Sequence, residues 1–405
     1  MLAEIYPQDY SSLPLLGPHL EGFVAWLRLQ GYPRLPIRLR VRAAKRFDAL
    51  LRRRGVRRLG DLSEEELLSY ASADARDRAA LVRSLARYLS EQKALAPARS
   101  TPVLELTTSY RTQLESVRGL SASTVRHHAA TVRELLAWLG DDQLDARLRR
   151  LDGRAIESFI QVVAARLGRD SLQHAIANLR SFLRFLGARG LAPGGLDARI
   201  DTPRVYRGER LPRALPWETV RAFLRAIDRS TPKGRRDYAM FLLVVTYGLR
   251  SCEVTSLKLD DIEWRSSQLR VPRCKVRSSL VLPLTPEVGT ALLAYLRDGR
   301  PPLAQREVFL RIPGPAGTLK PTCLNSAFQT WVRRGALPIP FKGPHCLRHS
   351  LAIHLLRQGT SLKTIGDILG HRSSESTCVY LRLHVDDLRE VALNLPASAR
   401  QEVTR

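Results

Sequence analysis

The carboxyl-terminal part of the chain gathers residue types that can cleave a phosphodiester bond. His345 opens the run His-Cys-Leu-Arg-His, in which Arg348 is the fourth residue. Further along, Leu-Gly-His ends at His371, and Tyr380 follows nine positions later. Upstream, Arg250 ends the tripeptide Gly-Leu-Arg. Two arginines, histidines and a tyrosine in this order are suited to attack on a phosphate by a tyrosine nucleophile.

Such a reaction needs a nucleophile, a clamp for the phosphate charge, a base, and an acid for the leaving 5′ oxygen. Tyr380 is the candidate nucleophile, with a role as a core aromatic as the alternative. A phenol has a pKa near about 10, so it needs neighbouring arginines and a proton acceptor such as His345 or His371. Arg250 and Arg348 are the candidate clamp, because a guanidinium donates two hydrogen bonds to phosphate oxygens.

A zinc site is the competing interpretation of the histidines. His345 and His349 are four positions apart, but Arg348 between them would repel a dication and no glutamate follows His345. We therefore expect no metal or other cofactor. His349 is expected to support the site, and His354 and His384 to be surface or core residues. The five cysteines are scattered without a C-x-x-C pair, which is typical of free thiols in a reducing compartment; they are Cys252, Cys274, Cys323, Cys346 and Cys378.

The overall charge points to a polyanionic partner. The 405 residues include 65 Lys+Arg against 39 Asp+Glu, a net charge of +26. Nucleic acid is the first candidate for the partner, and an arginine-rich proteome is the alternative explanation. No apolar run is long enough to span a membrane, and the first residues lack the regions of a signal peptide. We expect a bacterial cytoplasmic protein associated with the nucleoid.

Breaks in composition divide the chain into three predicted domains. The polar, proline-containing segments 96–102 and 201–210 are the candidate linkers. The domains are then expected at 1–98, 105–198 and 211–405, the last including a carboxyl-terminal tail.

The first two domains have similar sequence patterns. Gly31 and the apolar positions after it repeat 88 positions later at Gly119, and the segment 82–89 repeats 97 positions later at 179–186. Apolar residues at helical spacing with arginines between them predict helices in both domains. Duplication of one helical module explains the pattern, and convergence of arginine-rich amphipathic helices is the alternative.

Local patterns predict the elements around the candidate site. The capping segment 121–124 predicts a helix that runs to about 139, and the segment 168–171 precedes another that runs to about 186. A buried helix is expected over about 237–247, ending at Gly248. A short helix is expected at 251–257 and a strand-like piece at 308–310. The segments 268–271 and 279–284 predict a β-hairpin with a basic turn that contains Lys275.

Several further arginines are candidates for contact with phosphates. Arg126, Arg180 and Arg184 fall on the polar faces of the predicted helices of the second domain, and Arg273 and Arg277 flank the hairpin turn. A solvated face is the ordinary explanation for such residues, and tracking of a phosphate backbone is the functional one.

The ordered set of motifs resembles the tyrosine recombinases, also called the phage integrase family. The resemblance covers 211–393 and, more loosely, 105–195. It implies a mainly α fold with a small β-sheet, in which a helical SAM-like core-binding domain precedes a mixed α+β catalytic domain. The distance of eight residues from Lys275 to Pro283 matches the hairpin of the family. The resemblance implies that Lys275 enters the minor groove and protonates the leaving 5′ oxygen, and Arg273 and Arg277 are the alternatives for that role.

The resemblance also implies an activity and partners. The site would contain six residues: Arg250, Lys275, His345, Arg348, His371 and Tyr380. The enzyme would clamp double-stranded DNA and exchange strands through a 3′-phosphotyrosyl intermediate, without metal, ATP, a small-molecule substrate or a membrane. Exchange would occur in a homo-tetramer through a Holliday junction, with or without sister recombinases, to integrate or excise a mobile element.

Two other functions remain open at this stage. A type IB topoisomerase shares the chemistry, and a DNA-binding accessory protein could keep an unused site. The first 98 residues depart from the simplest members of the family, and they resemble an accessory or DNA-binding module or a duplicate of the core-binding domain. The segment 385–395 is amphipathic enough to dock on a neighbouring protomer or on its own domain.

Overall fold

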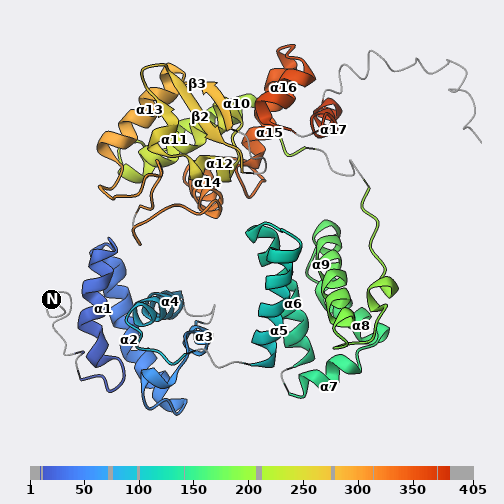
Figure 1. Cartoon of the computed structure of the whole chain (residues 1–405). Coiled ribbons are helices and arrows are strands. Elements are labelled where there is room, and N and C mark those ends of the chain that lie inside the picture. Colours follow the sequence, from blue (N-terminus) through green and yellow to red (C-terminus); the bar gives the residue numbers. More distant parts are fainter. Residues whose placement is uncertain are drawn as a thin grey trace, which may run out of the picture. The chain divides into compact units, whose positions relative to one another are not determined.

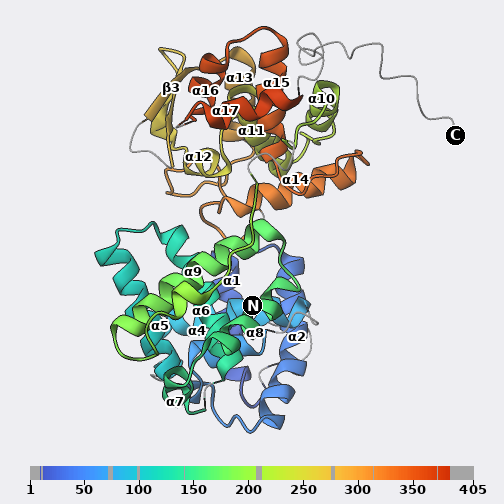
Figure 2. The same cartoon turned by 90° about the vertical axis from the view of Figure 1, so that its right-hand side faces the viewer.

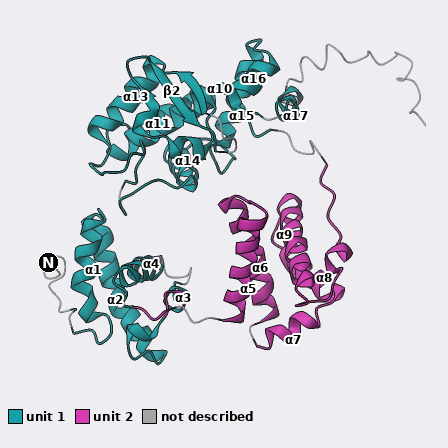
Figure 3. Cartoon of the chain, in the orientation of Figure 1, with its two compact units in different colours: residues 1–62, 66–94, 210–405 teal, residues 63–65, 95–209 magenta. Residues whose placement is uncertain are grey.

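The computed structural model describes most of the chain, with short gaps. The described residues are 10, 12–71, 76–97, 101–140, 142–206, 212–274, 279–312, 314–371 and 373–383. They form two compact units, one made of 1–62, 66–94 and 210–405 and the other of 63–65 and 95–209 (Figure 3). None of the helices in the described segments combines the length and apolar character that a bilayer crossing needs. Lys275, Arg277, His384 and the predicted tail helix 385–395 lie outside the described residues.

The first helices of the chain form a small helical module (Figure 1). They are α1 (Gly17–Leu29), α2 (Arg34–Arg53), α3 (Glu64–Ser69) and α4 (Arg76–Glu91). The buried carboxylate of Asp48 on α2 accepts hydrogen bonds from the backbone N–H groups of Leu15 (3.0 Å) and Leu16 (2.9 Å). The carboxylate thereby ties α2 to the start of α1 and satisfies N–H groups that a helix terminus leaves without partners.

The second unit is also helical. It contains α5 (Pro102–Thr112), η2 (Gln113–Val117), α6 (Ala122–Leu139), α7 (Leu144–Arg149), α8 (Gly153–Ala164), α9 (Arg169–Ala188) and η3 (Leu196–Arg199). The two predicted helices, running to about 139 and about 186, are confirmed, and the Ser121 side chain caps α6 by accepting from the Thr124 N–H at 3.3 Å. At the centre, the Tyr110 hydroxyl on α5 lies 2.9 Å from Ser181 Oγ on α9 and 2.9 Å from His128 Nδ1 on α6.

The carboxyl-terminal domain is a helical body with one small sheet (Figures 1 and 2). Its helices are α10 (Trp217–Arg225), α11 (Pro232–Tyr247), α12 (Ser251–Ser256), η4 (Leu259–Asp261), α13 (Pro286–Asp298), α14 (Thr322–Arg334), α15 (His345–Arg357), α16 (Leu362–Leu369), α17 (Glu375–Cys378) and η5 (Val379–Leu383). The strands are β1 (Ile262–Glu263), β2 (Gln268–Pro272) and β3 (Ser279–Pro283), which pair antiparallel in that order. The inward residues of β2 and β3 pack into one core with α11 and α13.

Comparison with the predicted elements shows two differences. The hairpin of β2 and β3 is confirmed, with Gln268 opposite Pro283, and so is the end of α11 at Gly248, which has a φ of +63°. The strand-like piece 308–310 is not a strand: Leu310 makes one isolated bridge to Thr318. Its apolar run is explained by burial in the core rather than by pairing with a neighbouring strand. The short strand β1 has no clear pattern in the sequence and was not predicted.

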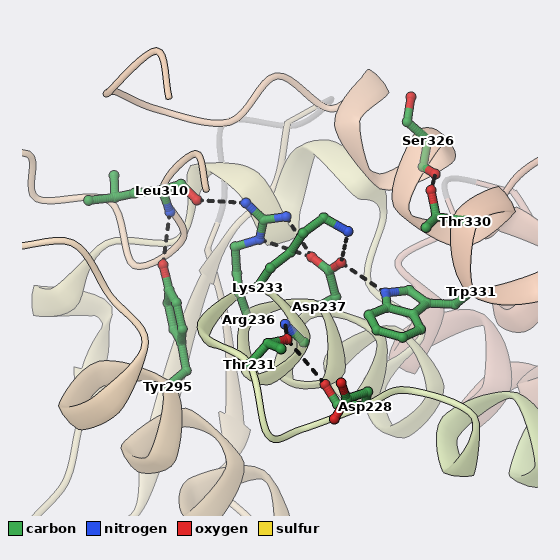
Figure 4. Close-up of polar contacts among 11 residues, drawn as sticks. Asp228, Thr231, Lys233, Arg236, Asp237, Tyr295, Leu310, Ser326, Thr330 and Trp331 are labelled. Atoms are coloured by element: carbon green, nitrogen blue, oxygen red, sulfur yellow. Dashed lines mark hydrogen bonds and ion pairs between the residues drawn. The ribbon is translucent and has the colours of Figure 1, made fainter. Parts of the chain in front are cut away.

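A buried ionic network fixes α11 in the domain (Figure 4). The fully buried Asp237 accepts from Arg236 (2.7 Å and 2.9 Å), from Trp331 Nε1 on α14 (2.9 Å) and from Lys233 Nζ (3.2 Å). Arg236 also donates to the Leu310 carbonyl at 3.0 Å. A buried charge is tolerated when its hydrogen bonds are satisfied, as they are here. The network holds the helix whose other end delivers Arg250 to the candidate site.

Candidate active site

Arg250 is placed by the turn between α11 and α12. Gly248 adopts the left-handed conformation there, and a Cβ at this position would collide with Leu369 and crowd Leu351. Arg250 Nη1 then lies 2.9 Å from Oε1 of the fully buried Glu253, whose Oε2 accepts from the Arg250 backbone N–H at 2.8 Å. Glu253 thus holds both the backbone and the guanidinium of Arg250.

Three arginines converge on the carboxyl end of α16. Arg273 Nη1 donates to the Leu369 carbonyl at 3.0 Å, Arg348 Nη2 donates to the same carbonyl at 2.5 Å, and Arg250 Nη2 donates to the Gly370 carbonyl at 3.1 Å. Arg348 Nη1 also donates to the Gly248 carbonyl. The last carbonyls of a helix lack partners within the helix and carry a partial negative charge, which favours cations. The helix end therefore collects three guanidinium groups from distant parts of the chain.

Arg273 is a part of this cluster that the sequence did not assign to it. Its side chain is only 6% exposed, and its Nη1 lies 3.7 Å from Glu253 Oε1. A Cβ on Gly370, which has a φ of +62°, would collide with the Arg273 guanidinium. The glycine of Leu-Gly-His thus leaves room for this arginine. In the sequence Arg273 was a candidate for phosphate contact beside Lys275, with nothing to indicate that it reaches the end of α16.

Tyr380 lies inside the cluster, on η5, and is 1% exposed. Its Oη is 3.0 Å from His349 Nδ1, and its ring stacks on His371 with 6.2 Å between the centroids. His371 Nδ1 is in turn 2.8 Å from Thr377 Oγ1. His345 is the exposed first residue of α15, and its ring centroid lies 4.5 Å from that of His349. The structure therefore brings together all the described members of the predicted set.

His349 has a more direct position than the sequence indicated. We expected a supporting residue, whereas its ring is the hydrogen-bond partner of Tyr380. Burial, together with the charges of His345 and Arg348, lowers the pKa of His349 to about 3. A neutral ring can accept a hydrogen bond from the Tyr380 hydroxyl at Nδ1. The spacing His-x-x-x-His places both rings on one face of α15, but it does not reveal the contact with Tyr380.

Charge and burial oppose each other at the tyrosine. Burial raises the pKa of Tyr380, while Arg348 and Arg250 lower it. Burial also lowers the pKa of His371 to about 4, with Arg348 and Arg250 adding to the effect, and it lowers the pKa of Arg348 to about 10. At neutral pH Tyr380 is therefore a protonated phenol between two neutral histidines. The positive charge of the arginines favours the binding of an anion or the formation of a phenolate at this site.

The histidine pKa values predict a stability that depends on pH. His349 and His371 are neutral in the folded protein down to pH values of about 3 and about 4, whereas in the unfolded chain they bind protons below a pH of about 6.5. The free energy of unfolding should therefore fall as pH falls from 7 to 5. Above pH 7 these two histidines should add nothing to its dependence on pH. Urea unfolding of a His349→Gln variant should depend less on pH in this window.

The comparison variant for this measurement is His127→Gln, because His127 is exposed on α6. It should retain the dependence of the unfolding midpoint on pH. Equal dependence in the wild type and in His349→Gln would contradict a neutral, buried His349.

The candidate DNA-contacting arginines of the second unit have different surroundings. Arg126 is exposed on α6. Arg180 donates to the Ile200 carbonyl, and Arg184 Nε lies 3.5 Å from Asp197 Oδ2. The last two side chains connect α9 to the segment around η3, so each has a structural contact that the sequence pattern did not reveal.

Two of the scattered cysteines meet beside the arginine cluster. All five cysteines are free, but a hydrogen bond from Cys274 lowers the pKa of Cys252 to about 7, while Cys252 raises the pKa of Cys274. Within the segments that the structure describes, no three His, Cys, Asp or Glu residues are grouped as metal ligands.

Models of known protein families match both the second unit and the carboxyl-terminal domain. Residues 213–386 match the model of the phage integrase family, and residues 108–190 match that of the phage integrase N-terminal SAM-like domain. A putative integrase/recombinase, y4rA of Sinorhizobium fredii, is 34% identical over 404 residues, which cover 96% of this chain and 97% of that protein. The chain belongs to the phage integrase family of tyrosine recombinases. It is a site-specific recombinase, an enzyme that exchanges DNA strands.

Other relatives and solved structures agree with this assignment. Tyrosine recombinase XerC of Oceanobacillus iheyensis is 31% identical over 228 residues, covering 55% of this chain and 73% of XerC. The fold is similar to XerH recombinase bound to its difH substrate, with a TM-score of 0.53, 18% identity, and coverage of 81% of this chain and 97% of that one. A λ integrase dimer on a core site gives a TM-score of 0.52 at 18% identity, covering 68% of this chain and 94% of that one. The predicted fold class, mainly α with a small sheet, is thereby confirmed.

Proposed function

We propose that Tyr380 is the nucleophile of this recombinase. Its Oη attacks the phosphorus of the scissile bond, a 3′-phosphotyrosyl ester forms, and the 5′ oxygen leaves and takes up a proton to become a hydroxyl. The ester keeps the energy of the broken bond, so attack by a 5′ hydroxyl of another strand reverses the chemistry. In this scheme the phenolic proton passes to a neighbouring histidine, His345, His349 or His371, and Lys275 protonates the leaving oxygen.

The observation that carries the proposal is the convergence of Arg250, Arg348, His371 and Tyr380, from four separate segments, onto one end of α16. A guanidinium has five N–H donors, so an arginine that holds a backbone carbonyl can still offer donors to a phosphate. Such donors stabilise the additional charge of a pentacoordinate transition state. A phosphate bound at the arginines would also need Tyr380 to exchange its bond with His349 for a position in line with the leaving oxygen.

The wider assembly follows from the same proposal. Double-stranded DNA would be held by a core-binding domain at 105–198 and a catalytic domain at 211–405, with exchange in a homo-tetramer. Two findings support this. The SAM-like family model lies within the first range, and the fold is similar to a λ integrase tetramer on a Holliday junction with a TM-score of 0.53 at 16% identity. The substrate would be a mobile DNA element that is integrated or excised in the bacterial nucleoid.

A suicide-substrate experiment tests the chemistry. Nicked duplexes made from the ends of the DNA element that carries the gene lose a short 5′-hydroxyl fragment after cleavage, which prevents rejoining. The wild-type protein should give an adduct that survives SDS, is sensitive to protease, and joins the protein to the 3′ phosphate of the cleaved strand. Tight binding to these ends without any adduct would favour the accessory function, whereas relaxation of a supercoiled plasmid without such ends would favour a topoisomerase.

A further inference from the structure

The first helical module has the same buried pattern as the SAM-like domain that follows it. The six buried positions of α2 fall, 88 positions later, on buried positions of α6. Ile37, Val41, Ala44, Phe47, Asp48 and Leu51 correspond in order to Val125, Ala129, Val132, Leu135, Leu136 and Leu139. Both helices follow a glycine with a positive φ, Gly31 at +72° and Gly119 at +59°.

The last helices of the two modules correspond in the same way. Buried residues of α4 correspond to buried residues of α9 that lie 97 positions later in the chain. A buried serine occurs at the same place in both helices, Ser84 in α4 and Ser181 in α9. The other pairs are Ala79 and Ile176, Val82 and Leu179, Leu85 and Phe182, Ala86 and Leu183, and Leu89 and Leu186. Leu81 is the exception, since its counterpart, Asn178, is half-buried.

Contacts between the helices are repeated as well. Phe23 on α1 packs on Tyr88 of α4 with centroids 5.6 Å apart and an interplanar angle of 51°. The matching pair, Tyr110 on α5 and Phe185 on α9, is 5.1 Å apart at 52°. Tyr110 lies 87 positions after Phe23, one fewer than the shift that relates α2 to α6. Amphipathic helices that became similar by convergence would share a period, but they would have no reason to share the pairs that meet across the core. The repeated contacts therefore favour duplication of the module.

In both modules the buried serine of the last helix is connected by hydrogen bonds to a polar side chain of the preceding long helix. Arg40 on α2 donates from Nε to Ser84 Oγ at 3.1 Å. Its counterpart, His128 on α6, reaches Ser181 through the hydroxyl of Tyr110. In each module a polar side chain of the second long helix is thus connected to the serine of the last helix. The amino-terminal module lies outside both of the family matches, which cover 108–190 and 213–386.

A stripe of exposed cations runs along α2. At 3.6 residues per turn its exposed basic residues fall within about one third of the helix circumference, opposite the buried stripe. They are Arg34, Arg38, Arg42, Lys45, Arg46, Arg52 and Arg53. The helix contains one acidic residue, Asp48, which is buried and bonded to the start of α1. The helix itself therefore adds no exposed carboxylate to the stripe.

We propose that the amino-terminal module is a second copy of the SAM-like domain and binds duplex DNA through this stripe on α2. A helix of 20 residues is about 30 Å long, close to one turn of B-form DNA at about 34 Å. Regularly spaced guanidinium groups on such a length suit successive phosphates, which need no particular base sequence. On α6 the counterpart of Arg38 is Arg126, which is also exposed. The protein thus has two related helices that can follow a DNA backbone.

This proposal adds a DNA-binding surface to the recombinase, and it does not depend on which tyrosine is the nucleophile. The test compares two triple variants of the full chain that remove equal charge from the same module. One is Arg42→Gln, Lys45→Gln and Arg46→Gln, on the stripe. The control is Arg83→Gln, Arg87→Gln and Lys93→Gln, which are exposed on or just after α4.

The stripe variant should lower affinity for the element ends by about tenfold or more and reduce the slope of log K against log salt by about two to three. Hydroxyl-radical footprinting should show the loss of one protected stretch of backbone, while protection elsewhere remains. The control variant should keep the wild-type slope and footprint. An affinity, slope and footprint that stay at wild-type values in the stripe variant would overturn the proposal.

Formation of the suicide-substrate adduct distinguishes a failure of the DNA-binding proposal from a failure of the nucleophile assignment. Both variants should form the adduct at saturating DNA, because neither alters the site around Tyr380. If the wild type forms no adduct, the assignment of the nucleophile fails, but the difference between the two footprints still decides whether α2 binds DNA.

Discussion

A Tyr380→Phe protein should form no covalent adduct with nicked substrate, and its affinity for DNA should stay within about twofold of wild type. Phenylalanine keeps the ring that stacks on His371 and removes only the oxygen that would become the phosphate ester. No other tyrosine occurs after Tyr295, and the hydroxyl of Tyr295 is committed to the Leu310 N–H at 3.1 Å. The expected effect is therefore complete loss of adduct rather than a reduced rate.

The variant also loses the hydrogen bond to His349, which costs about 1 kcal/mol of stability when a buried partner is left behind. Circular dichroism and DNA binding would show that the fold survives this loss. Tyr206→Phe is the matched control, because Tyr206 is 63% exposed and should tolerate the change with full adduct formation. An adduct that persists in Tyr380→Phe, mapped by peptide sequencing to another residue, would assign the nucleophile elsewhere.

The sequence was sufficient for most of the elements and for the order of the candidate site residues, because both depend on local patterns. Helical periodicity located α6, α9 and α11, and the alternation around the basic turn located β2 and β3. Short motifs made Arg250, Arg348, His371 and Tyr380 the candidates for the site, without information on their distances. Motifs of this kind are specific because several unusual residues must occur together and in order.

The contacts within the site could not be predicted in this way. Arg273 contributes a third guanidinium because it reaches the end of α16, which lies 95 or more positions away in the chain. The bond from His349 to Tyr380 likewise depends on how α15 packs against η5. Arg184 looked like a residue of a solvated face, yet it pairs with Asp197, because a turn after α9 returns the chain to that helix. Such partners are decided by tertiary packing, which periodicity does not contain.

Arg348→Ala should slow adduct formation by about 10² to 10³ at saturating DNA, the usual effect of removing one donor that stabilises transition-state charge. Arg348 is buried, and its guanidinium also holds the carbonyls of Gly248 and Leu369. Loss of these donors leaves acceptors unsatisfied, at a cost of about 1 to 3 kcal/mol each. The variant is therefore expected to be both slower and less stable, and the two effects must be separated.

The variant Arg236→Ala separates the effect on rate from the effect on stability. Arg236 is also a buried arginine that donates to a backbone carbonyl, that of Leu310, but it lies in the Asp237 network at the start of α11 (Figure 4). Its removal should lower the urea midpoint at least as much, because it leaves part of a buried carboxylate unpaired. Adduct formed per folded molecule should nevertheless stay near wild type.

The comparison of the two variants then decides what Arg348 does. A large rate loss in Arg348→Ala alone, measured per folded molecule, means that its guanidinium acts on the phosphate as well as on the end of α16. Equal rates in both variants would mean that Arg348 only positions the helix end. In that case Arg250 and Arg273, which donate to the neighbouring carbonyls, would be left to hold the phosphate charge.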